Sequence, residues 1–293
     1  MPTARLYKTE AIVLRQRRLG EADRILMLFT PGYGKLDAKA KGVRKTTSRM
    51  SGHLQPLTRC VVQLAQGRAS DVITGCQTLE SFQGVREDLE RLSRALYAAE
   101  LVDRFAPERV PAVMTYRLLL DTLRRLEAGP GDGGTGRGGS RTAPTGEDMA
   151  HGAQQAAPLH GERNEADMAL RYFEMQLVDQ SGFRPQLDRC VGCGLALEPR
   201  ENCFSPQSGG ALCPQCAMGT AGTRALSLNA LKVMRLMQRR SFVDVARVAA
   251  PASLMQEIER HLRSYIVCVL ERDVNSAAFI ERLRREQALA VEV

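Results

Sequence analysis

The sequence has no tryptophan and only four histidines, and aromatic residues make up 5% of its 293 positions. It contains no run of about 18 apolar residues, the length that a membrane-spanning helix requires. Residues 1–10 carry no apolar secretory core, so we expect a reducing cytoplasm as the compartment. There is no GxxxxGK[ST] phosphate loop, and four histidines offer no nucleophile–base arrangement, so we expect no enzymatic activity. We expect His53 and His261 to be capping or surface residues.

The excess of positive charge in the chain is confined to its first 80 residues. Lys and Arg exceed Asp and Glu by eight overall, and residues 1–80 hold 14 basic and 6 acidic residues against 27 of each sign in residues 81–293. A basic module joined to a neutral remainder favours a polyanionic partner, because Lys and Arg release the counterions condensed on phosphates. The alternative is a solvated basic face that serves solubility.

The apolar pattern of residues 1–80 predicts five short strands. They cover residues 11–14, 25–29, 35–42, 60–64 and 72–74, with a short helix in 48–54 between the third and the fourth. This order is typical of the five-stranded OB-fold barrel, which binds single-stranded nucleic acids.

The rest of the chain has helical periodicity, interrupted by one polar stretch. Helices are predicted at 85–105, 112–126, 166–180, 228–239, 252–270 and 277–289. Residues 129–165 are rich in Gly, Ala, Pro, Ser and Thr, which predicts a disordered insert. We therefore expect an α+β multidomain protein: an OB-fold domain at 1–80, a helical domain at 82–185 and 220–293, and a zinc module at 186–219.

The most specific motif is a pair of CxxC turns, formed by Cys190 with Cys193 and Cys213 with Cys216. This is zinc-ribbon spacing, and four thiolates would hold one Zn²⁺ tetrahedrally with no open position, as in a structural site. Gly192 and Gly194 supply the permissive backbone of the first turn. We interpret Cys203 as a packing residue, and Cys60, Cys76 and Cys268 as small core residues.

Three other uses of these cysteines are less consistent with the sequence. Disulfides need an oxidising compartment, and a redox dithiol normally accompanies a βαβ pattern that neither pair has. A zinc deaminase would use the HxE motif of His160-Gly161-Glu162 before Cys190, but Arg189 stands where that signature has proline.

Taken in order, these features resemble the RecO family of bacterial recombination and repair mediators. The segments that carry the resemblance are Ala11-Ile12-Val13-Leu14, Gly20-Glu21-Ala22-Asp23-Arg24, Phe29-Thr30, Gly34-Lys35, Ala40-Lys41-Gly42, Ser48-Arg49, Phe183-Arg184-Pro185, Phe204-Ser205 and Gly209-Gly210. The similarity spans nearly the whole chain, and only residues 129–165 depart from it.

The resemblance implies annealing of complementary single strands coated by single-stranded-DNA-binding protein, and loading of RecA together with RecR, in the bacterial nucleoid. No bond is made or broken in these steps. It also implies a site in the helical domain for the acidic tail of single-stranded-DNA-binding protein. The candidate residues are Lys232, Arg235 and Arg239, and the alternative is Arg117 with Arg124.

The candidate DNA-binding residues are basic and lie around the first loop and after the third strand. They are Arg15, Arg17, Arg18, Arg24, Lys35, Lys39, Lys41, Arg44, Lys45 and Arg49. With few aromatics before residue 97, charge should contribute more than base stacking. The main rival is a zinc-ribbon OB-fold protein that binds RNA or acts in transcription.

Overall fold

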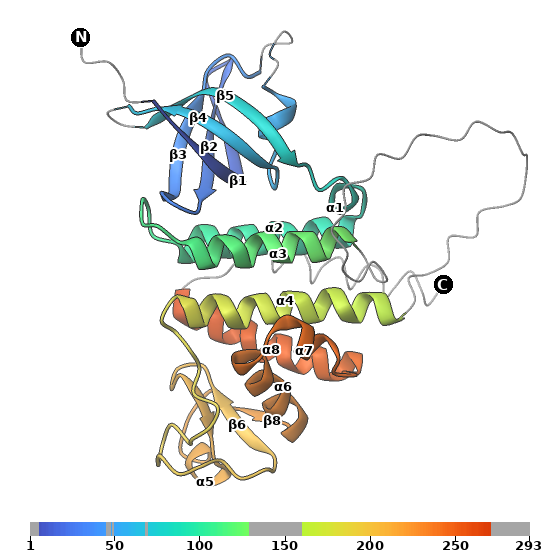
Figure 1. Ribbon diagram of the computed structural model, residues 1–293. Helices are drawn as coiled ribbons and strands as arrows, with labels where there is room; N and C mark the ends of the chain where they lie inside the picture. Colours follow the sequence, from blue (N-terminus) through green and yellow to red (C-terminus); the bar gives the residue numbers. More distant parts are fainter. Residues whose placement is uncertain (1–5, 45–47, 49, 68–69, 129–159, 271–293) are drawn as a thin grey trace, which may run out of the picture.

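The computed structural model describes residues 6–44, 48, 50–67, 70–128 and 160–270. Figure 1 shows a β-barrel above a layer of helices, with a small β-sheet below that layer. The predicted fold class, an OB-like barrel with a helical domain and a four-cysteine module, is confirmed. Among the described helices, none combines the length and apolar character needed to cross a membrane.

The barrel has the strand order of an OB fold. Its strands are β1 (Leu6–Leu19), β2 (Asp23–Thr30), β3 (Gly34–Ala40), β4 (Arg59–Ala65) and β5 (Asp71–Glu80), and the short helix η1 (Gly52–Leu54) precedes β4. The closed order is β1-β2-β3-β5-β4, in which β3 and β5 are parallel. A register shift in β1 between Val13 and Arg15 lets this long strand pair with β4 in its first half and β2 in its second.

Strand β2 is apolar from Ile25 to Phe29, and from Leu26 onward both of its faces are covered. Leu26 and Leu28 point into the barrel, whereas Met27 and Phe29 point out and join the core of the helical layer. The barrel therefore rests on the helices through an apolar contact.

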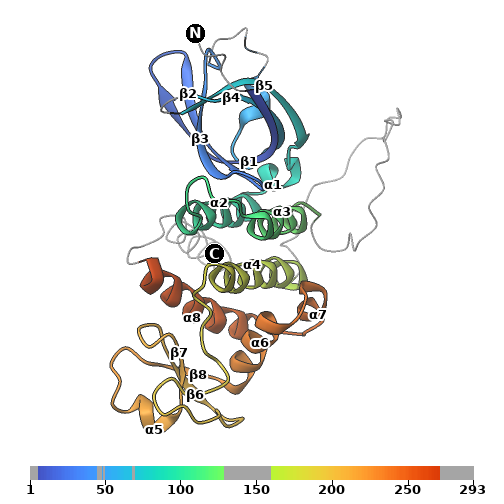
Figure 2. The same cartoon turned by 60° about the vertical axis from the view of Figure 1, so that its left-hand side comes forward.

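The helical layer consists of two sets. Next to the barrel lie α1 (Gln83–Glu87), α2 (Leu89–Phe105) and α3 (Val113–Ala128), and beneath them lie α4 (His160–Gln180), α6 (Leu228–Arg239), α7 (Phe242–Ala246) and α8 (Ala252–Leu270), as Figure 2 shows. Side chains cap three of the described helices: Asp88 accepts from Arg91 N at the start of α2, Ser227 from Ala230 N at the start of α6, and Ser241 from Asp244 N at the start of α7.

The predicted limits of α6 and α8 agree with the structure, but the expected start of α4 was six residues late. Helix α4 begins at His160, so residues 160–165 of the predicted disordered insert are helical. The remaining 129–159 and the predicted helix at 277–289 lie outside the described residues.

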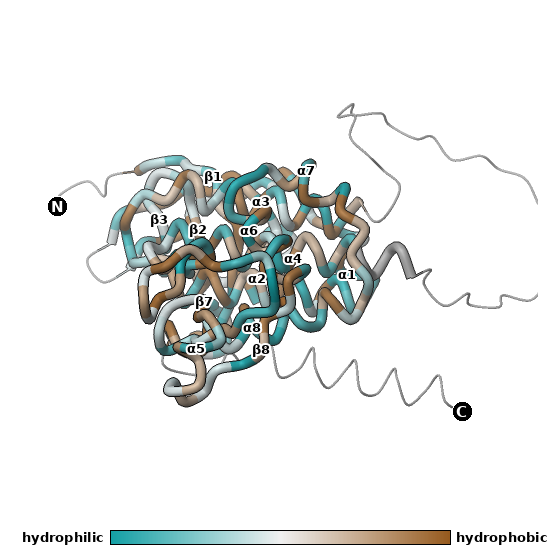
Figure 3. The backbone as a smooth tube through the Cα atoms, turned by 90° about the horizontal axis from the view of Figure 1, so that it is seen from below, coloured by the Kyte–Doolittle hydropathy of each residue, from teal (hydrophilic) through white to brown (hydrophobic). Residues whose placement is uncertain are grey.

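The small sheet and its helix form a ribbon, made of β6 (Asn202–Ser205), β7 (Gly210–Leu212), α5 (Pro214–Ala217) and β8 (Arg224–Leu226). Strand β8 pairs with β6 and was not predicted, so the ribbon sheet extends to Leu226, past the expected boundary at residue 219. Figures 1 and 3 show the ribbon beneath the end of the helical layer opposite α1. Phe204 attaches it to α8 through edge contacts with His261 and Tyr265.

Backbone hydrogen bonds also join the barrel to the loop between α2 and α3. The amide of Arg109 donates to Lys35 O at 2.8 Å, and that of Ala112 donates to Pro31 O at 3.1 Å. Gly34 makes this approach possible: it has φ +63°, and a Cβ atom there would lie 1.9 Å from Val110 O.

A fully buried carboxylate strengthens the same junction. Asp71 accepts a hydrogen bond from the Tyr7 hydroxyl at 2.5 Å and lies 3.4 Å from the guanidinium of Arg109. Burial, followed by the hydrogen bond to Asp71, raises the pKa of Tyr7, so this hydroxyl remains a donor. The barrel and the helical layer are thus joined by apolar, backbone and ionic contacts.

Candidate nucleic-acid interface and metal centre

Six of the predicted DNA-binding residues gather at one corner of the barrel, where β1, β2 and β3 meet. In the strand register Arg18 is opposite Arg24, while Ile25 lies between Arg17 and Lys39. We call the set Arg17, Arg18, Arg24, Lys39, Lys41 and Arg44 the basic corner. Figure 2 shows the β1–β2 hairpin on the side of the barrel away from the helices.

The loop after β3 is fixed against the β1–β2 hairpin. Asp23 Oδ1 accepts from Gly42 N at 2.7 Å, and Arg44 N donates to Ala22 O at 3.0 Å. The acids nearby are Glu21, Asp23 and Asp37, of which Asp37 lies 3.5 Å from Arg17. The basic corner therefore keeps a positive excess on a rigid support, which suits a phosphate backbone.

Arg15 and Lys35 do not belong to the basic corner. Both form ion pairs with Asp103 of α2, and the Lys35 side chain is only 12% exposed. Lys45 and Arg49 lie outside the described residues.

Aromatic side chains are not part of the basic corner. Phe29 and Phe82 are buried, and Tyr7 packs against Tyr33 with ring centroids 4.7 Å apart. Tyr33 lies in the β2–β3 turn, at the other end of both strands from the basic corner. The arrangement favours charge over base stacking as the source of affinity.

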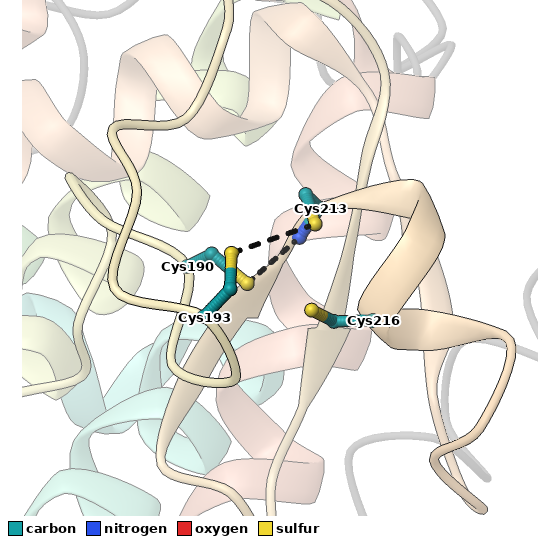
Figure 4. Close-up of side chains that lie close together, drawn as sticks. All are labelled: Cys190, Cys193, Cys213 and Cys216. Atoms are coloured by element: carbon teal, nitrogen blue, oxygen red, sulfur yellow. Dashed lines mark hydrogen bonds between the residues drawn. The ribbon is translucent and has the colours of Figure 1, made fainter.

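The two CxxC turns meet in the ribbon, as Figure 4 shows. The sulfur atoms of Cys190, Cys193, Cys213 and Cys216 all lie within 4.8 Å of one another, and those of Cys193 and Cys213 are 4.0 Å apart. Four sulfurs around a tetrahedral zinc ion would be separated by roughly 3.8 Å, given Zn–S bonds of about 2.3 Å. The group therefore fits one such ion after only small shifts. Cys203 is not a member of this group.

The surroundings of the sulfurs also suit a cation. Burial would raise the pKa of Cys190, but the backbone N–H groups of Cys213, Cys193 and Gly192 bring that pKa down to about 6. The contact with Cys213, followed by that with Cys190, raises the pKa of Cys216 to about 12. Crowded sulfurs of this kind resist losing all their protons unless a cation balances the charge.

Gly192 is required for a reason other than the backbone freedom that was predicted. A Cβ atom there would lie 3.1 Å from Cys216 Sγ and 3.2 Å from the Leu212 side chain, whereas the positive φ, +75°, belongs to Gly194. The first turn is thus shaped by close approach at one glycine and by left-handed backbone at the other.

The deaminase interpretation does not fit this geometry. His160 and Glu162 lie at the beginning of α4, and the metal-binding turns follow its end. The 18 residues from Glu162 to Gln180 correspond to a helix length of about 27 Å.

The three candidate residues for the protein partner do not form one free surface. Arg235 donates two hydrogen bonds to Leu187 O, at 2.9 and 2.7 Å, and Arg239 donates to Asp188 Oδ1 at 2.5 Å. Both therefore hold α6 against the segment that leads into the ribbon, while Lys232 is exposed.

His261 is 2% exposed, so the expectation of a capping or surface residue is wrong. Burial lowers its pKa from the usual 6.5; Glu257 opposes this shift, and Arg260 and Arg224 add to it. The helical period of α8 could have indicated its burial, but not its contact with Phe204.

We expect His261 to make the attachment of the ribbon sensitive to acid. Its folded-state pKa lies below the unfolded value, so the unfolded chain binds more protons between the two values. The stability that the neutral, buried His261 side chain contributes is fully present above about pH 6.5, and it is lost as the pH falls through the folded-state pKa. In thermal unfolding at about pH 7.5 and 5.5, His261→Gln should lose less stability on acidification than the unsubstituted protein. Any release of metal by acid would affect the two proteins alike. Equal losses of stability in the two proteins would contradict the role assigned to His261.

Sequence reasoning also missed Asp71 and Asp103. Asp71 shares β5 with Glu80, and Asp103 shares α2 with Glu90 and Glu100. Nothing in the neighbours of either residue along the chain marks it as a contact with a distant basic residue.

Comparison with known proteins gives consistent matches over both parts of the chain. The family model described as "Recombination protein O N terminal" matches residues 3–82, and "Recombination protein O C terminal" matches residues 86–134 and 159–278. A DNA repair protein RecO from Dehalococcoides mccartyi is 36% identical over 278 residues, 95% of this chain and 96% of the relative. The protein of that name from Roseiflexus sp. is 36% identical over 96% of this chain and 87% of its own length. The one from Nocardioides sp. is 33% identical, over 94% and 100% respectively.

Proposed function

Because this chain belongs to the RecO family of DNA repair proteins, we propose that it binds single- and double-stranded DNA and anneals complementary single strands. The strands would be coated by single-stranded-DNA-binding protein, and together with RecR the protein would help RecA to load onto them, in the bacterial nucleoid. The observation that carries the proposal is the basic corner on an OB-fold barrel.

The basic corner suggests how annealing would be accelerated. Two approaching strands repel each other through their phosphates, and this repulsion is screened only over a Debye length of about 10 Å at 0.1 M salt. Cations held along the edges of β1, β2 and β3 would neutralise phosphates of both strands at once. They carry no base-specific geometry, so the two sequences would be paired by their own bases.

We propose that the four cysteines hold Zn²⁺ in a structural role. Four thiolate ligands suit this ion and leave no position for substrate, so the bound ion would supply folding energy and no reaction step. The contact of Phe204 with α8 supports a bracing role for the ribbon.

The proposal is tested by annealing fluorescent complementary strands precoated with single-stranded-DNA-binding protein, either intact or without its acidic tail. We expect acceleration that depends on the tail. If only bare strands annealed faster, the protein would be a DNA-binding protein without the proposed action on coated strands. Tight binding of RNA in preference to single-stranded DNA at equal salt, with no annealing, would favour the RNA-binding alternative.

The role of the basic corner can be tested by replacing Arg17, Arg18 and Lys41 together by Ser. The dependence of log affinity on log salt should become shallower by about 2, at roughly 0.7 for each lost phosphate contact, and affinity at low salt should fall about a hundredfold. Fluorescence anisotropy with an oligothymidylate measures both quantities.

A matched control removes the same charge from the helical domain. Arg117, Arg240 and Arg247 have exposed side chains there, and their joint replacement by Ser should leave the salt dependence nearly unchanged. Equal effects of the two triple variants would mean that net charge, rather than the basic corner, governs binding.

A further inference from the structure

Asp103 is an acidic residue next to the proposed DNA-binding surface, on the side of the helices. It lies near the end of α2, and its Oδ2 accepts a hydrogen bond from Arg15 Nε at 2.6 Å. Its Oδ1 lies 3.4 Å from Lys35 Nζ, and Lys35 also donates to the backbone oxygen of Asp103. One carboxylate thus engages two of the ten residues expected to bind DNA.

The strand register shows where this carboxylate lies relative to the basic corner. Arg15 is opposite Met27 in the β1–β2 pair, and Lys35 is opposite Phe29 in the β2–β3 pair. Asp103 therefore reaches over the outer face of β2 and joins residues on the strands on either side. Arg17 of the basic corner comes two residues after Arg15 in β1, and Lys39 comes two residues after Asp37 in β3. Both lie on the same outer face as Arg15 and Asp37.

The two ion pairs differ in how easily they can be exchanged. The Lys35 side chain is 12% exposed and has two acceptors on the same residue, so it is a fixed part of the junction between the barrel and the helices. The Arg15 side chain is 53% exposed, and exposed ion pairs are weak because water and salt screen them. A phosphate oxygen offers Arg15 the same kind of charge-assisted hydrogen bond as a carboxylate does.

The geometry points to Asp103 as an internal competitor of DNA. We infer that it holds Arg15 in the free protein, and that a bound strand takes Arg15 from it, extending the DNA contact from the basic corner down to α2. This inference rests on the proposed function. Asp103 would lower the affinity for single strands and so ease their release after annealing.

The test is Asp103→Asn, which keeps the shape of the side chain and removes its charge. We expect affinity for a fluorescent oligothymidylate at low salt to rise about three- to tenfold, with a salt dependence steeper by about 0.7, as for one added phosphate contact. Glu165→Gln is the matched control, because it removes the same charge from an exposed position on α4. An equal gain in the control would overturn the inference.

A double-mutant cycle separates competition for Arg15 from a general change in the electrostatic field of the protein. In the Arg15→Gln background, Asp103→Asn should bring little or no gain, because the residue for which DNA and Asp103 compete is absent. A gain of undiminished size in that background would also overturn the inference.

Two further measurements keep the result interpretable. If Asp103→Asn folds poorly, the Arg15 Nε–H resonance of the unsubstituted protein, assigned with Arg15→Gln, should shift on addition of the oligonucleotide, and an unchanged resonance refutes competition. The Arg17, Arg18 and Lys41 triple variant tests the proposed function separately. If that variant loses binding while Asp103→Asn has no effect, only the inference about Asp103 fails.

Discussion

Cys190→Ser is expected to reduce the bound metal from one ion per chain to nearly none, and to unfold the ribbon together with part of the helical layer. Cys190 is the most buried of the four ligands, and its sulfur accepts a hydrogen bond from Cys213 N at 3.3 Å. A serine hydroxyl is a poor zinc ligand, and three remaining thiolates leave the site incomplete.

The expected size of the effect follows from the coupling between metal and fold. Structural zinc contributes about 10 kcal/mol or more in small zinc-binding peptides, and even a third of that would lower the unfolding midpoint here by roughly 10 °C. The loss should spread beyond the ribbon, because Phe204, Leu212 and Leu226 belong to the same apolar core as the helices.

Metal content by elemental analysis and thermal unfolding by circular dichroism measure the two effects. Cys203→Ser is the matched control: Cys203 lies in the same ribbon, opposite Leu212 in the β6–β7 pair, and is not among the four ligands. It should keep the metal. A Cys190→Ser protein that retained one ion per chain, or lost it with an unchanged midpoint, would contradict the bracing role.

Gly34→Ala is expected to destabilise the junction between the barrel and the helices by about 3–5 kcal/mol, from left-handed backbone strain and overpacking together. The added methyl would lie 1.9 Å from Val110 O, and a backbone atom cannot move aside as a flexible side chain can. The loop would have to withdraw, which would break the hydrogen bonds of Arg109 with Lys35 and of Ala112 with Pro31. Chemical denaturation with tryptophan-independent detection, such as circular dichroism, measures the change in the free energy of unfolding.

The control lies in the same turn. Gly32 has no atom within 4 Å of an added Cβ and no positive φ, so Gly32→Ala should change stability by no more than about 0.5 kcal/mol. If the two alanine variants had the same stability, the close approach at Gly34 would not matter to the fold.

The features that could be predicted from the sequence are those that depend on residues close together in the chain. The strands of the barrel follow from apolar runs with turn residues between them, and α6 and α8 follow from helical periodicity. The metal site was predictable because each CxxC pair is local, so only the meeting of two turns had to be inferred.

What could not be predicted depends on contacts between distant segments. Arg15 and Asp103 are 88 residues apart, and nothing near either one indicates that they pair. Strand β8 has three residues and exists through its pairing with β6, and the burial of His261 depends on where the ribbon docks. The start of α4 at His160 was not predicted, because the residues before Ala166 are mostly polar and show no apolar helical pattern.

The pairing of α3 with α4 offers a practical opportunity. Thr115, near the start of α3, bonds to Gln180, at the end of α4, so the two helices run antiparallel and Ala128 and His160 lie at the same end, as Figure 1 also shows. A few residues suffice to connect neighbouring antiparallel helices, and the family model passes over residues 135–158. A fluorophore or affinity tag inserted there would leave the barrel and the metal site untouched, so one labelled protein could report on DNA binding, annealing and metal loss.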